Sequence, residues 1–171
     1  MQDSLDRMWS TSAGYLLVAA LVGLWVWPKF FGVDIHPLFG WAEAQSGAGW
    51  LEPGLRYVVG AAAAVIALLV LLPRTRMIGG WAALGLSLLF IVAHLTPWLG
   101  VNIPSYGPLM EALASGRTAE DIAAMGLKTD RGAHFTLAMV NAGLAAIMLG
   151  AEYKLRRPRA PKLTHVLAQA A

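Results

Sequence analysis

Histidine is the residue type of this chain that offers the most chemistry. His94 lies near the end of a long apolar run, His134 near the start of another, and His36 in the polar stretch after the first apolar run. An imidazole can hold a proton, donate or accept a hydrogen bond, or ligate a metal near neutral pH. The chain has no cysteine, which excludes thiol–disulfide chemistry, cysteine-ligated iron–sulfur clusters and covalent c-type haem attachment.

Two hypotheses assign His94 and His134 a role without a metal. In the structural one, both rings face a helix bundle and hydrogen-bond neighbouring helices or water. In the other, they form a pocket for a quinone or another small lipophilic ligand near the outer interface. His94, His134 and Asn141 would then hydrogen-bond the ring oxygens, and Trp98, Trp25 and Phe135 would pack on the ring. His134 and Asn141 are seven residues apart and share one helix face.

A third hypothesis makes His94 and His134 ligands of a haem or metal ion, with His36 or Asp34 as a further ligand. Their spacing matches no standard ligand motif, so we predict no metal site and rank haem below quinone. Lys29, at the outer end of the first apolar run, is expected to snorkel toward the interface.

The elements that position these residues are long apolar runs. Hydrophobic residues make up 57% of the chain and charged residues 13%. Four uncharged runs, at 8–28, 57–73, 77–99 and 132–151, have the length needed to cross a bilayer. This pattern predicts an all-α fold, an antiparallel four-helix transmembrane bundle within residues 1–153.

A stripe of small residues predicts which way His94 points. Gly79, Ala83 and Ser87 recur every four residues, and His94 follows seven residues after Ser87 on the same helix face. Small residues let helices approach closely in lipid, so His94 is expected to face the bundle. The polar stretch at 102–130 includes a predicted short helix from Thr118 to Met125, with Thr118 as its cap.

The distribution of charge predicts the orientation. Four spans place both ends of the chain and the 73–76 turn on one side, which holds eight of the 13 basic residues and three of the ten acidic ones. The positive-inside rule puts that side in the cytoplasm. Residues 154–171 then form a basic, solvated cytoplasmic tail. Because the basic residues flank membrane spans, nucleic-acid binding is not expected.

Several short segments resemble the DoxX-like family of small four-helix bacterial membrane proteins. The matching segments are Pro28–Gly32 (PKFFG), Leu55–Gly60 (LRYVVG), Leu71–Gly80 (LLPRTRMIGG), Ala93–Thr96 (AHLT) and Thr129–Gly132 (TDRG). The glutamate that many members carry in the second helix is replaced here by Ala63. The resemblance implies an accessory or quinone-interacting component of a redox-linked complex in the bacterial inner membrane.

Two other functions stay open. The chain could be a non-catalytic structural subunit or assembly factor of a larger membrane complex or, less favoured, a small-solute transporter. No self-contained catalytic motif occurs, and the spans have no paired carboxylates of the kind that relay protons in pumps. The expected partners are the lipid bilayer and other membrane proteins.

Overall fold

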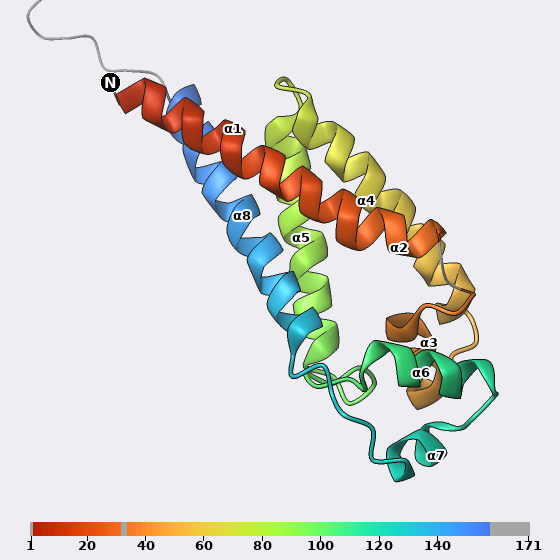
Figure 1. Cartoon of the computed structure of the whole chain (residues 1–171). Coiled ribbons are helices and arrows are strands. Elements are labelled where there is room, and N and C mark those ends of the chain that lie inside the picture. The colour runs from red at the N-terminus through yellow and green to blue at the C-terminus, as the bar shows by residue number, and fades with distance from the viewer. Residues whose placement is uncertain (1, 32–33, 158–171) are drawn as a thin grey trace, which may run out of the picture.

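The computed structural model describes residues 2–31 and 34–157, and within these the regular structure is helical apart from one isolated bridge between Pro104 and Thr129 (Figure 1). The predicted all-α class is confirmed. The elements, in chain order, are α1 (Gln2–Ala20), η1 (Leu21–Val26), α2 (Trp27–Phe30), α3 (Pro37–Ser46), η2 (Leu51–Leu55), α4 (Arg56–Leu71), α5 (Arg76–His94), α6 (Tyr106–Ala114), α7 (Ala119–Ala124) and α8 (Ala133–Arg156).

Four helical segments of the described chain are long and apolar enough to cross a membrane: Ser4–Phe30, Leu51–Leu71, Arg76–His94 and Ala133–Arg156. The first is continuous from α1 through η1, a wider π-helical turn, into α2. α5 ends at His94, whereas the apolar run continues to Leu99. Pro97 accounts for the earlier end, since the residues just before a proline are disfavoured in a helix.

The long helices form a ring of neighbours in which α1 packs on α8, α8 on α5, α5 on α4, and α4 on η1. Glycine allows two of these contacts. A Cβ added at Gly79 would lie 2.7 Å from the backbone nitrogen of Val70, and one at Gly80 would lie 2.6 Å from Cε of Met148. α5 is therefore pressed closely against both α4 and α8, and the buried positions of Ala83, Ser87 and His94 confirm the predicted stripe.

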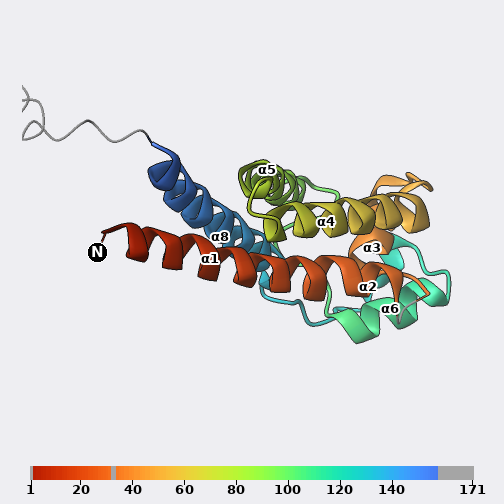
Figure 2. The same cartoon turned by 90° about the horizontal axis from the view of Figure 1, so that it is seen from above.

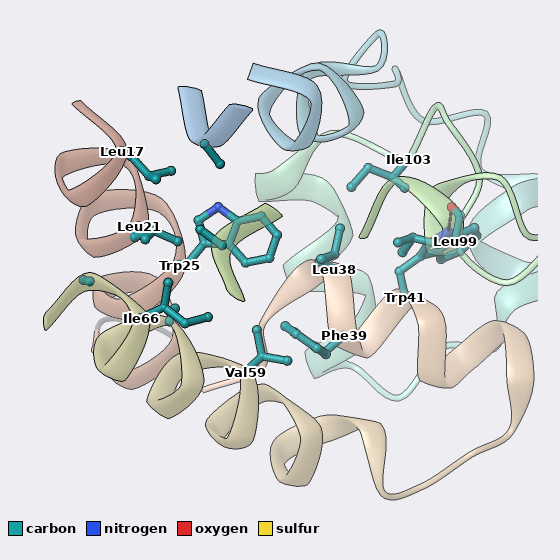
Figure 3. Packing of buried hydrophobic residues seen from close by; sticks show 14 of the residues in the cluster. Leu17, Leu21, Trp25, Leu38, Phe39, Trp41, Val59, Ile66, Leu99 and Ile103 are labelled. Atoms are coloured by element: carbon teal, nitrogen blue, oxygen red, sulfur yellow. Dashed lines mark hydrogen bonds between the residues drawn. The ribbon is translucent and has the colours of Figure 1, made fainter. Parts of the chain in front are cut away.

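The short helices gather at one end of the long ones. α3, α6 and α7 lie at the end of the bundle where α5 ends and α8 begins, away from the N-terminus (Figures 1 and 2). α3 and α6 were not expected from the sequence, whereas α7 confirms the predicted helix and Thr118 cap. α3 buries Leu38, Phe39 and Trp41 against the core (Figure 3).

The other end of the bundle is joined by an ion network around Glu152. Its carboxylate accepts a 2.6 Å hydrogen bond from the Ser10 hydroxyl and lies 3.5 Å from Arg76 and 3.3 Å from Arg156. These groups join α1, α5 and α8. α8 continues to Arg156 and so includes the first residues of the segment 154–171, which was predicted to be a solvated tail. Residues 158–171 of that segment lie outside the described part of the chain.

Candidate functional site

A cavity of about 240 Å³ lies at the end of the bundle that carries α3 and α6. Its polar wall combines three histidines, a lysine and a tyrosine from five different segments, and its apolar wall is built largely from rings and leucines. The lining residues are Leu24, Trp25, Pro28, Lys29, His36, Leu38, Phe90, His94, Tyr106, His134 and Leu137. A cavity of roughly 150 Å³ already accommodates benzene, so a substituted six-membered ring fits this volume.

His94 enters the cavity from the last residue of α5 and is buried. The chain turns back after α5, and its Nδ1 lies 2.7 Å from the carbonyl oxygen of Gly100. A carbonyl only accepts, so Nδ1 carries the proton and donates it. In the neutral ring, Nε2 is then an acceptor, and no described residue donates to it.

His134 is held in the same tautomer from the first turn of α8. Its Nδ1 lies 2.9 Å from Oδ2 of Asp130, a largely buried carboxylate. Asp130 also accepts the backbone N–H groups of Ile103, Gly132 and His134. Burial raises the pKa of Asp130, but the hydrogen bonds from the His134 ring and these amides outweigh burial and hold the pKa below its ordinary value. Asp130 is thus a carboxylate that orients His134 and can stabilise its protonated form.

Two aromatic side chains, Tyr106 and Phe135, pack against the imidazole rings of His134 and His94. Tyr106 of α6 stacks on His134 at a centroid distance of 6.2 Å and an interplanar angle of 11°. Phe135 meets His94 edge-on at 6.0 Å. Burial raises the pKa of the Tyr106 phenol above its ordinary value, so the phenol keeps its proton and can donate it to a ligand.

Lys29 and His36 form the opposite polar wall. His36 caps α3: its Nδ1 accepts the backbone N–H of Leu38 at 3.3 Å, and its Nε2 lies 2.8 Å from Nζ of Lys29. Burial holds the pKa of His36 far below its ordinary value, so the ring is neutral. The expectation that Lys29 snorkels is wrong, because the side chain turns inward and is only 5% exposed.

The two other residues predicted for the pocket lie elsewhere. Trp98 is 60% exposed and lines a separate apolar groove of about 470 Å³ between α3, α4 and α5, which also holds Trp50. Asn141 is buried on α8, and neither its amide nitrogen nor its oxygen has a partner among the described residues. Trp25, which was predicted to pack on the ring, does line the cavity, and Phe90 meets it edge-on at a centroid distance of 4.2 Å.

The sequence reasoning missed Asp130 and Lys29 as members of the site. Asp130 precedes His134 by four residues at the start of an apolar run, a spacing that brings two side chains together on a helical turn. That signal was present in the sequence. In the described ranges, no three His, Asp or Glu side chains are grouped closely enough to hold a metal ion, and Asp34 contacts Arg56 through its backbone carbonyl.

Comparisons of the chain with protein-family models, with curated proteins and with solved structures give no match.

Proposed function

We propose that this chain is a DoxX-like, multi-pass protein of the bacterial inner membrane that binds a quinol or quinone and serves as an accessory component of a redox-linked complex. The four apolar helices and the cavity at one end of them support this proposal. In it, the long helices run antiparallel and both termini lie in the cytoplasm, in keeping with the charge distribution. The cavity then lies near the outer surface.

One observation carries the proposal: two imidazoles that line one cavity both have Nδ1 at hydrogen-bond distance from a protein oxygen. Nδ1 of His94 donates to the carbonyl oxygen of Gly100, and Nδ1 of His134 donates to the carboxylate of Asp130. In its neutral form, each ring then has an acceptor at Nε2. The ligand that suits such a site is an apolar ring carrying hydroxyl donors, which is the reduced form of a quinone.

The geometry also supports proton removal from such a ligand. Oxidation of a quinol needs a redox centre in a partner protein to take its two electrons, and Nε2 of His94 and of His134 can then each accept one hydroxyl proton. Asp130 stabilises the imidazolium that forms on His134. The quinone that results has carbonyl oxygens, which need hydrogen-bond donors. The phenol of Tyr106 is one such donor in the cavity.

The apolar side of the cavity suits a ligand that arrives from lipid. Leu24 on η1 and Leu137 on α8 line the cavity and are also partly exposed. Trp25 and Phe90 supply faces for the ring. A tail attached to the ring can therefore leave between η1 and α8 toward the acyl chains.

The experiment compares binding of a decyl-substituted benzoquinol by wild type and by His94→Asn in lipid nanodiscs, read by tryptophan fluorescence. Asparagine keeps an N–H donor for Gly100 but has no group at the position of Nε2. An unmet buried hydrogen bond costs about 1–3 kcal/mol, so quinol affinity should fall about tenfold. Trp98→Leu, in the separate groove, is the control and should bind as wild type does. Absence of quinol binding by wild type would refute the proposal.

A second candidate function, a non-catalytic subunit, is favoured by one surface. The groove lined by Trp50 and Trp98 is apolar and lies between α3, α4 and α5. Such a surface suits a helix of a partner protein. Loss of complex assembly on changing these tryptophans, with quinol binding absent in wild type, would select this function.

A further inference from the structure

We propose that Lys29 is a neutral, nucleophilic amine that captures the carbonyl carbon of a lipophilic aldehyde or ketone in the cavity as an imine. The quinol reaction proposed above does not use this residue. The inference shares the cavity with that function but does not depend on it.

The hydrogen bonds of His36 determine the protonation of Lys29. Nδ1 of His36 accepts the Leu38 N–H as the cap of α3. Because a neutral imidazole has one N–H, that proton must be on Nε2. Nζ of Lys29, 2.8 Å away, can accept this proton only through a free lone pair. An ammonium group has no lone pair, so the amine is neutral.

The surroundings of Lys29 agree with a neutral amine. Among the described residues, no carboxylate forms an ion pair with Lys29, and Glu52 is paired with Arg56 at 2.9 Å. A buried charge without a counter-ion is costly and is normally avoided by losing the charge. A neutral amine also keeps two N–H donors, and the carbonyl of Leu24 lies 3.5 Å from Nζ.

The reaction needs no reactant other than the carbonyl compound. The lone pair of Nζ attacks the carbonyl carbon, and a C–N bond forms as the C=O π pair moves to oxygen. The resulting carbinolamine then loses water, whose oxygen comes from the carbonyl group and whose two hydrogen atoms come from the amine. A C=N bond remains. Tyr106 lines the same cavity and can donate a proton to the departing hydroxyl, and it recovers a proton from the amine nitrogen. The apolar wall excludes bulk water, which would otherwise hydrolyse the imine.

The test treats wild type in nanodiscs with benzaldehyde and cyanoborohydride at pH 7, then maps modified lysines by mass spectrometry. A solvated lysine is neutral in only about one molecule in a few thousand at this pH. We expect labelling of Lys29 to exceed that of exposed Lys128 and Lys154 by at least about tenfold. Equal labelling of the three lysines, or none at Lys29, would overturn the proposal.

A matched variant tests the protonation argument. His36→Asn keeps a cap for α3, because asparagine is a preferred cap residue, but removes the N–H that donates to Lys29. Labelling of Lys29 should fall severalfold, and unchanged labelling would contradict the role of His36. If this variant fails to fold, the site-resolved comparison within wild type still decides the proposal.

The two proposals fail separately. Quinol binding is measured on the same wild-type preparation. Bound quinol with an unmodified Lys29 would refute imine formation alone. A modified Lys29 without quinol binding would refute the quinol function alone.

Discussion

The close approach of α5 to α4 gives a prediction whose size can be worked from the structure. A Cβ at Gly79 would lie 2.7 Å from the backbone nitrogen of Val70 and 2.8 Å from the backbone carbon of Leu69. These are backbone atoms, so no side chain can turn aside and the two helices must separate. Overpacking of this kind costs about 1–3 kcal/mol, and we expect Gly79→Ala to be destabilised by that amount.

Gly85 on the same helix is the matched control. Nothing lies within 4 Å of a Cβ added there, so Gly85→Ala should gain helix propensity, about 0.5–1 kcal/mol, without a clash. Unfolding of both variants is followed in detergent by circular dichroism against denaturant. Because α5 also carries His94, Gly79→Ala should lower quinol affinity while Gly85→Ala does not. Two variants of equal stability would refute the packing argument.

Three further predictions address the two ends of the bundle. Asp130→Asn removes the negative charge beside the His134 ring, so under the proposed quinol function quinol oxidation should slow while quinol still binds; an unchanged rate would show that Asp130 only caps α8. Because the pKa of Asp130 is lower in the folded protein than its ordinary value, its stabilisation is present above that ordinary value and is lost as pH falls through the lowered one. Acid unfolding of Asp130→Asn should therefore depend less on pH in that window than wild type, and identical profiles would contradict this. Glu152→Gln leaves Arg76 without its buried partner and should cost about 3 kcal/mol of unfolding free energy, whereas exposed Glu120→Gln should change little; equal midpoints in denaturant would show that the network contributes nothing.

The helical framework could be predicted because its causes are local. An uncharged run of sufficient length must satisfy its backbone hydrogen bonds internally in a bilayer, which favours a helix. The spacing of Gly79, Ala83 and Ser87 also predicted correctly that His94 is buried. The Thr118 cap followed from its own side chain and that of Asp121, three residues away.

The composition of the site depended on tertiary contacts that no local pattern contains. α3 forms in a stretch containing several glycines and prolines, because Pro37 begins it, Gly47 ends it in a left-handed conformation and its apolar face meets the core. Trp41 on α3 is buried, and its indole N–H donates to the carbonyl oxygen of Leu99 at 3.3 Å, a contact between residues 58 positions apart. The inward direction of the Lys29 side chain could not be predicted either, because its partner His36 is positioned as the cap of α3.

The π-helical turn of η1, Leu21–Val26, sits just before Lys29. Such a turn amounts to one residue inserted into an otherwise regular helix. The wider turn absorbs this extra residue, so Lys29 lies on the face that it would have in a regular helix one residue shorter. Winding the same residues as a regular α-helix, without a deletion, would rotate everything after them by about 100°. Lys29 would then turn out of the cavity although no residue of the sequence had changed. The π-helical turn, and not the identity of the residues around it, therefore keeps the amine in the cavity.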